Sequence, residues 1–232
     1  MPTKHLVMSP NYLAIVRGLR ELHELTATGR LDSPEADSVR DATDSPWEAL
    51  TDEEKRRISG LSEDLYSITD PPRKGSKEMN PQAQARLMDT YQARQRGEWD
   101  RVLELLRRWG AYLDPSMLSY LRGATWLEAG DPATAAIFYK HASDLQPDNP
   151  NYFCMYLIAL NRAAPREARQ LADEILGKHK TYKPVVIAHA VNIKLDEAEE
   201  SRASDASDLF RNLIPILEYA LGALQNNHPL QG

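Results

Sequence analysis

Apolar residues recur at helical spacing on both sides of a short polar break near the middle of the chain. The first apolar stripe consists of Met117, Leu118, Leu121, Ala124 and Leu127, and the second consists of Ala135, Ala136, Phe138, Tyr139, Ala142 and Leu145. Between the stripes, Gly130 suits the left-handed end of one helix, Asp131 suits the cap of the next helix, and Pro132 suits its first turn. The pattern predicts a hairpin of two helices over residues 116–151.

The same pattern is found again 33 residues earlier and 33 residues later. Gly97 takes the place of Gly130 in the earlier copy, and Pro165 takes the place of Pro132 in the later one. The positions equivalent to Ala135, Phe138, Tyr139 and Ala142 are Val102, Leu105, Leu106 and Trp109 in the earlier copy, and Ala168, Leu171, Ala172 and Ile175 in the later copy. Three helical hairpins in register, with small residues where the helices approach, resemble the tetratricopeptide repeat (TPR) over residues 82–180.

This resemblance implies an all-α, TPR-like solenoid of stacked hairpins. In that family the first helix of each hairpin lines a concave groove that holds a peptide or a partner's helix. The corresponding residues of this chain are Leu87, Tyr91, Arg94, Tyr120, Ala124, Leu127, Phe153, Leu157 and Leu160. Chaperone-binding members hold the terminal carboxylate of their ligand with lysine, asparagine and arginine, whereas the positions of that clamp carry Leu87, Tyr91, Leu121, Pro150 and Cys154 here. We therefore expect an apolar, aromatic groove and no role as a heat-shock cochaperone.

Three functions are compatible with these features. The first is a non-enzymatic scaffold or adaptor that binds a protein or peptide partner in the groove. In the second, residues 12–28 of the chain fill the groove themselves, and the protein is a structural component of a homo-oligomeric assembly. The third is an enzyme with its site between the N-terminal helices and the repeats. The first is the function that we expect.

Polar and apolar patterning also predicts helices before the repeats. An amphipathic helix begins near Asn11 and stops at Gly29, and two Ser-Pro pairs, Ser33-Pro34 and Ser45-Pro46, suit helix starts. A capping box at Thr51–Glu54 predicts a helix to about Ile68, which would bury Ile58, Leu61, Leu65 and Tyr66. Residues 1–68 are therefore interpreted as an N-terminal helical extension, and the proline-rich and basic residues 69–80 as a linker.

The three repeats would occupy residues 81–182, followed by a C-terminal part over residues 183–232. We expect an irregular hairpin that begins at Lys183-Pro184, with Ser204 as a candidate cap for the last helix. That helix contains Pro215, which predicts a kink. Its apolar face would cap the open end of the repeat stack, because a solenoid has to cover its last apolar surface.

Composition excludes several classes of protein. The net charge is −6, and no region has the basic excess that nucleic-acid binding requires. An arginine-rich set, Arg94, Arg96, Arg101, Arg107 and Arg108, is interpreted as solvated side chains that offset nearby acids. The longest apolar runs are shorter than the roughly 20 residues of a membrane span. A single cysteine excludes an internal disulfide, and we expect a cytoplasmic protein without a membrane partner.

The residues that could carry chemistry are scattered. The six histidines are not spaced to bind a metal from one helical face, and the acids of residues 32–50 lack the spacing of a calcium loop. Cys154 lies in an apolar run and is interpreted as a core residue, not a nucleophile. We therefore expect no enzyme activity, no cofactor and no metal site.

Overall fold

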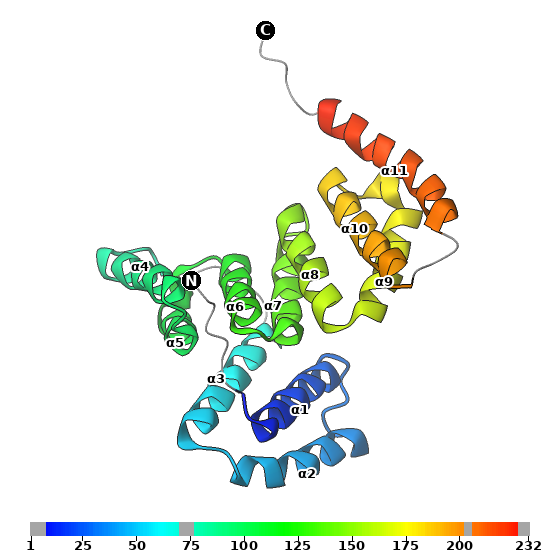
Figure 1. The fold of residues 1–232 in the computed structure, drawn as a ribbon. Coiled ribbons are helices and arrows are strands. Elements are labelled where there is room, and N and C mark those ends of the chain that lie inside the picture. Colours follow the sequence, from blue (N-terminus) through cyan, green and yellow to red (C-terminus); the bar gives the residue numbers. More distant parts are fainter. Residues whose placement is uncertain (1–7, 70–76, 202–205, 227–232) are drawn as a thin grey trace. The chain divides into compact units, whose positions relative to one another are not determined.

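The computed structural model describes residues 8–69, 77–201 and 206–226, and the predicted all-α fold class is confirmed (Figure 1). These residues form helices and no strand. The helices are α1 (Pro10–Ala27), α2 (Pro34–Glu48), α3 (Asp52–Thr69), α4 (Pro81–Gln95), α5 (Trp99–Trp109), η1 (Gly110–Tyr112), α6 (Pro115–Ala129), α7 (Pro132–Leu145), α8 (Pro150–Ala163), α9 (Pro165–Gly177), η2 (His179–Thr181), α10 (Pro184–Ser201) and α11 (Ala206–Asn226).

Most helices begin where the local sequence predicts. The capping box is present, because the Glu54 backbone N–H donates to Thr51 Oγ1 over 3.2 Å and the Thr51 N–H donates to Glu54 Oε2 over 3.0 Å. Asp131 caps α7 by accepting a bond of 3.0 Å from the Thr134 N–H. The second Ser-Pro start is wrong: α2 runs through Pro46 and ends two residues later, at Glu48. Pro46 is therefore a helix-end residue, not a helix start.

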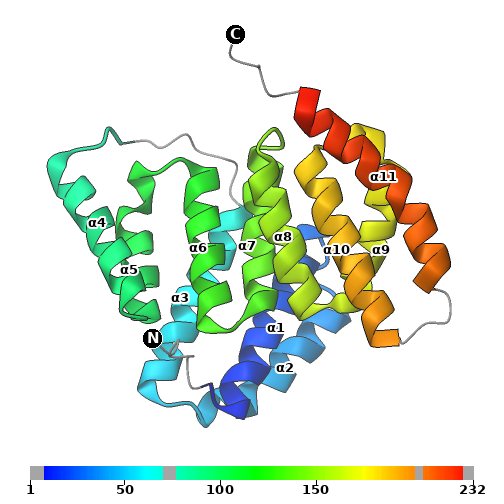
Figure 2. The same ribbon diagram turned by 45° about the horizontal axis from the view of Figure 1, so that its top comes forward.

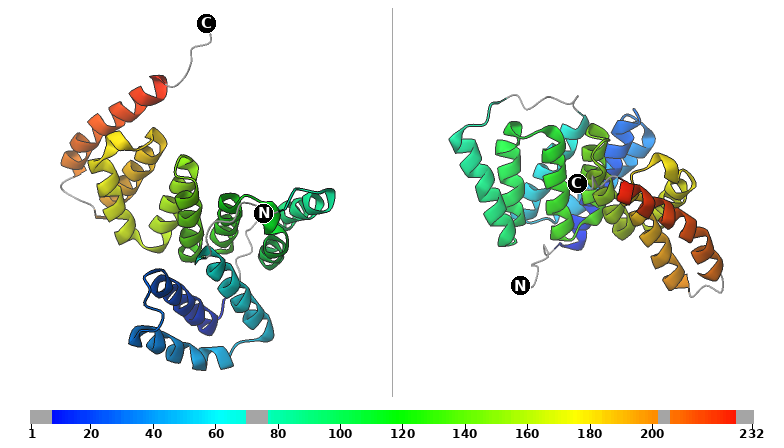
Figure 3. Two further views of the ribbon diagram at one scale, coloured as in Figure 1. Left: turned by 180° about the vertical axis from the view of Figure 1, so that it is seen from behind. Right: turned by 90° about the horizontal axis from the view of Figure 1, so that it is seen from above.

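The chain divides into two compact units, Met1–Gly130 and Asp131–Gly232. In the first unit, α1 packs against α2 and α3, α3 against α5, and α4, α5 and α6 follow one another as neighbours (Figure 2). The view from behind, the left panel of Figure 3, shows α1 to α3, drawn in blue and cyan, grouped together. The close crossing of α1 and α2 depends on Gly18, since a β-carbon there would lie 2.6 Å from the Thr43 methyl group.

In the second unit, each helix from α7 to α11 packs against the next one. An apolar core extends from α8 to α11 and consists of Cys154, Leu157, Leu160, Ala168, Ala172, Ile175, Leu176, Val186, Ile187, Ala190, Val191, Ile193, Leu213 and Ala220. The terminal helix α11 contacts this core through Leu213, Ile216 and Leu217. Pro215 lies inside α11, as predicted.

The position of Tyr66 and the proposed linker were two further predictions for the N-terminal part. Tyr66 was expected in the core, but its side chain is 61% exposed, whereas the preceding residues Asp64 and Leu65 are buried. Residues 70–76, most of the proposed linker, lie outside the described residues, as does Ser204. The linker and the domain limits therefore stay predictions.

Candidate partner-binding face

The residues expected in the groove of the first two hairpins lie on α4 and α6. Helix α4 buries Ala83, Thr90 and Ala93, and Ala93 packs with Val102 and Leu106 of α5. Leu87 and Arg94 lie beside this buried strip, while Tyr91 lies farther from it around the helix. The buried strip of α4 thus packs against α5, and Leu87, Tyr91 and Arg94 lie outside this helix–helix contact.

A bidentate ion pair joins α4 directly to α6. Arg94 Nε donates to Glu128 Oε2 over 2.9 Å, and Arg94 Nη2 donates to Glu128 Oε1. The two side chains are 34% and 36% exposed, so the pair is partly shielded from water. Bidentate geometry fixes both side chains and neutralises both charges. The pair therefore sets how the exposed sides of α4 and α6 lie next to each other.

The face formed by α4 and α6 is apolar and partly open. Tyr91 is 59% exposed, and Leu87, Tyr120 and Leu127 are half-buried. Ala124 is buried. We call Leu87, Tyr91, Arg94, Tyr120 and Leu127 the α4–α6 face.

The other three predicted groove residues, Phe153, Leu157 and Leu160, belong to the second compact unit, and Leu160 is buried in its core. The Phe153 ring stacks on the Tyr182 ring, with 6.3 Å between centroids, and lies 5.9 Å from the Tyr156 ring. Leu157 is completely buried in the apolar core of that unit. In the structure as described, Phe153 is therefore a half-buried aromatic contact and Leu157 a core residue.

A buried ionic cluster of the first unit escaped the sequence analysis. Asp64 of α3 is completely buried and lies 2.8 Å from Arg122 Nη2 of α6 and 3.2 Å from Arg107 Nε of α5. Arg122 Nη1 also donates to Ser67 Oγ over 2.8 Å. Gly60 makes room for Arg107, because a β-carbon at that position would lie 2.3 Å from the guanidinium. We call Asp64, Arg107 and Arg122 the buried ion cluster.

A signal for this cluster was present in the sequence. Asp64 lies three residues after Leu61 and directly before Leu65, on the stripe that faces the core. Arg107 was expected to be a solvated side chain, and that expectation is wrong because its side chain is only 20% exposed and pairs with Asp64. The expectation is confirmed for Arg96 and Arg101, which pair at the surface with Glu98.

The electrostatics of the cluster follow from its burial. Burial raises the pKa of Asp64 above its ordinary value, while the Arg122 and Arg107 guanidiniums oppose that shift. Burial likewise lowers the pKa of Arg122, and the Asp64 carboxylate opposes it. Buried ion pairs add little net stability, because desolvation offsets their attraction, but loss of one partner leaves a costly unpaired charge.

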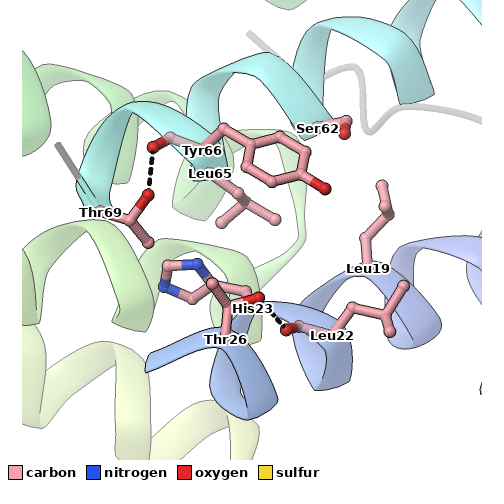
Figure 4. A pocket seen from close by; sticks show the side chains of 8 residues that line it. All are labelled: Leu19, Leu22, His23, Thr26, Ser62, Leu65, Tyr66 and Thr69. Carbon is pink, nitrogen blue, oxygen red and sulfur yellow. Dashed lines mark hydrogen bonds between the residues drawn. The ribbon is translucent and has the colours of Figure 1, made fainter. Parts of the chain in front are cut away.

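A small pocket lies between the C-terminal halves of α1 and α3 (Figure 4). Its lining is Leu19, Leu22, His23, Thr26, Ser62, Leu65, Tyr66 and Thr69. The Thr26 hydroxyl donates to the Leu22 carbonyl and the Thr69 hydroxyl to the Tyr66 carbonyl, each over 2.7 Å. Burial lowers the pKa of His23, which keeps its ring neutral near pH 7. The lining contains no carboxylate that could act as a catalytic partner of this imidazole.

Other groups with possible chemistry are explained by packing. Burial raises the pKa of Cys154 to about 11, so the thiol stays protonated at neutral pH. Within the described ranges, no group of three His, Cys, Asp or Glu side chains is arranged to hold a metal ion. None of the helices described combines the length and the apolar character of a membrane span. Comparisons with protein-family models, curated proteins and solved structures found no match.

Proposed function

We propose that the protein is a non-enzymatic interaction module whose α4–α6 face binds an apolar segment of a partner protein. The observation that carries this proposal is the 59% exposure of Tyr91, with Leu87 half-buried on the same helix and Tyr120 half-buried on α6, the helix that Arg94 reaches. Large aromatic side chains of this kind are common anchors at protein interfaces. The partner would be a peptide or an amphipathic helix laid along the face.

The packing of α1 supports an open face. Helix α1 packs mainly against α2 and α3, and α3 packs against α5. Tyr12, Ile15 and Val16, three of the apolar residues of α1, are already buried. This arrangement favours an external partner over the alternative in which residues 12–28 fill the groove.

The charge of the face supports an apolar partner segment. Arg94 and Glu128 neutralise each other, and Leu87 and Tyr91 stand where a carboxylate clamp would need polar or basic groups. Binding should therefore depend little on salt, since screening weakens interactions between charges and not apolar contacts. Membership of the TPR family and a cytoplasmic location are part of the same proposal, supported by the three-fold sequence pattern and the single cysteine.

The proposal is tested by affinity capture from the native organism, with the wild-type chain and two single variants as bait. Tyr91→Ala should lose the captured partner, while its free energy of unfolding changes by less than about 1 kcal/mol, because the ring is exposed. Tyr66→Ala is the matched control, since Tyr66 is 61% exposed but lies on α3, outside the α4–α6 face. Equal capture by all three chains would refute the proposal.

A second variant separates an open face from a filled one. Tyr120→Ala should destabilise the protein by less than about 1 kcal/mol if the face is open. If another segment of the chain covers Tyr120, the loss should reach about 3 kcal/mol or more, as for a buried aromatic residue. Chemical denaturation measures the difference.

A further inference from the structure

Helix α4 has one side that the described residues of the first unit leave uncovered. It packs against α5 through Ala93, Ala83 and Thr90 are also buried, and Arg94 reaches α6. The opposite side carries Gln84, Met88, Tyr91 and Gln95, which are all exposed. Met88 and Tyr91, the two large apolar side chains of this set, are 57% and 59% exposed. We call these four residues the α4 seam.

The spacing of the α4 seam is that of a helix–helix contact. Gln84, Met88, Tyr91 and Gln95 follow one another at intervals of four, three and four residues. Alternating intervals of three and four residues keep side chains in one line along a helix. Helices in coiled coils pack against each other with this spacing. The two apolar residues lie at the middle of the line, and a glutamine lies at each end.

The α4 seam is also free of charge. The charged residues of α4 are Arg86, Asp89 and Arg94. Arg86 and Asp89 pair with each other over 3.1 Å on another side of the helix, and Arg94 pairs with Glu128. A neutral seam can meet an identical seam without like-charge repulsion, whereas it offers nothing to attract a strongly charged partner.

We propose that two copies of the protein associate through their α4 seams, with the two helices antiparallel. A two-fold axis between residues 89 and 90 would bring Met88 against the partner's Tyr91, and Gln84 against the partner's Gln95. The same contact then occurs twice, as a two-fold interface requires. Methionine against an aromatic ring is a favourable pairing, and glutamine amides can donate and accept hydrogen bonds with each other.

The dimer is weak because one pair of helices forms it. Such a contact lies at the low end of specific interfaces, below about 1,200 Å² of total buried surface. We expect a dissociation constant between about 10 µM and about 1 mM, so the protein is a monomer when dilute and a dimer when concentrated.

Sedimentation velocity of the full chain from about 1 µM to about 1 mM tests the dimer directly. The wild type should shift toward the dimer as its concentration rises. Met88→Glu should weaken association at least about tenfold, because it places a charge in an apolar contact. Met79→Glu is the matched control, since Met79 is 50% exposed, precedes α4 and does not belong to the seam. It should associate as the wild type does.

Two double variants test the antiparallel register. Gln84→Glu with Gln95→Lys creates opposite charges across the proposed axis, and it should strengthen the dimer at low salt. Gln84→Glu with Gln95→Glu creates like charges across the axis and should weaken it. Positions 84 and 95 are three turns apart on one helix, so the two changes do not interact within a monomer. Circular dichroism checks that each variant remains folded.

Three outcomes would overturn the proposal. They are a wild-type monomer at every concentration, equal association of the Met88→Glu and Met79→Glu variants, and equal association of the two double variants. Tyr91 is left unchanged in these tests because it also belongs to the α4–α6 face. Loss of the dimer in Met88→Glu with partner capture intact would separate this inference from the proposed function.

Discussion

Asp64 occupies a position on α3 where the neighbouring pattern predicts an apolar side chain. Its carboxylate is held by two guanidiniums from α5 and α6, and Gly60, one turn earlier, gives Arg107 the space it needs. A buried carboxylate needs an oppositely charged partner, because burying an unpaired ion costs several kcal/mol. The cluster therefore fixes which side of α3 meets α5 and α6.

Removing one guanidinium from the buried ion cluster should lower the free energy of unfolding, because the Asp64 carboxylate stays buried. Arg122→Leu should destabilise the protein by about 3–5 kcal/mol near pH 7, because the buried carboxylate loses its nearest partner. Arg108→Leu, at a side chain that is 72% exposed, should change stability by less than about 0.5 kcal/mol. Urea denaturation of the two variants measures both values, and equal losses would show that the cluster is not structural.

The loss in Arg122→Leu should also depend on pH in a defined direction. Without Arg122, the pKa of Asp64 in the folded state rises further above its unfolded value of 3.8. A carboxyl with a raised folded-state pKa stabilises the fold below the unfolded pKa, and that contribution disappears as pH rises through the folded pKa. The deficit relative to the wild type should therefore shrink toward about pH 4. A deficit that grows on acidification would contradict this account.

Cys154 offers a second test at the level of one residue. Since its pKa is about 11, its reaction with a thiol reagent in the native protein should accelerate steadily from neutral pH up to about pH 11. At about pH 8 the native thiol should react at least about 100-fold more slowly than the thiol of the urea-denatured chain. Absorbance of the released thiolate follows the reaction. Similar rates in both states would mean that the second unit opens readily.

At the scale of the element, local sequence explains helix limits better than it explains what helices bury. The caps at Thr51 and Asp131 and the turn at Gly130 could be predicted from the sequence. Their hydrogen bonds and backbone geometry involve only neighbours within four residues. The predicted helix start at Ser45-Pro46 is wrong, since Pro46 lies near the end of α2. Asp64 and Tyr66 were missed or misplaced because their surroundings come from helices distant in sequence. The grouping of Leu87, Tyr91 and Tyr120 on one face stays a prediction from the repeat spacing, whereas the Arg94–Glu128 pair joins residues 34 positions apart and was not predicted.

The turn after α6 should be sensitive to bulk. Gly130 has φ of 97°, a left-handed conformation that strains residues with a β-carbon. Gly130→Val should lower the free energy of unfolding by about 1–3 kcal/mol. Gly177→Val is the control, because a β-carbon at Gly177 would meet nothing within 4 Å and its φ is not left-handed. An unchanged melting temperature for Gly130→Val would mean that the turn relaxes without cost.

At the scale of the whole molecule, the two compact units carry different natural reporters. All four tryptophans, Trp47, Trp99, Trp109 and Trp126, belong to the unit Met1–Gly130. The single cysteine, Cys154, belongs to the unit Asp131–Gly232. Fluorescence and thiol labelling therefore follow one unit each, without any change to the chain.

We expect these reporters to give separate unfolding transitions. The first unit contains a buried ion cluster, while the second has a continuous apolar core from α8 to α11. Tryptophan fluorescence should therefore change at a lower urea concentration than that at which Cys154 becomes reactive, and circular dichroism should span both transitions. Coincident midpoints would instead indicate one cooperative unit.

The prolines at the helix starts affect which insertions and deletions the chain can tolerate. Eight of the described helices, α1, α2, α4 and α6 to α10, have proline as their first residue. Proline cannot donate a backbone hydrogen bond, and it disfavours helical geometry in the residue before it. A residue inserted into a connecting segment would therefore lengthen that segment without extending the helix backward. Insertions and deletions between helices should be tolerated, because each helix keeps its own first residue.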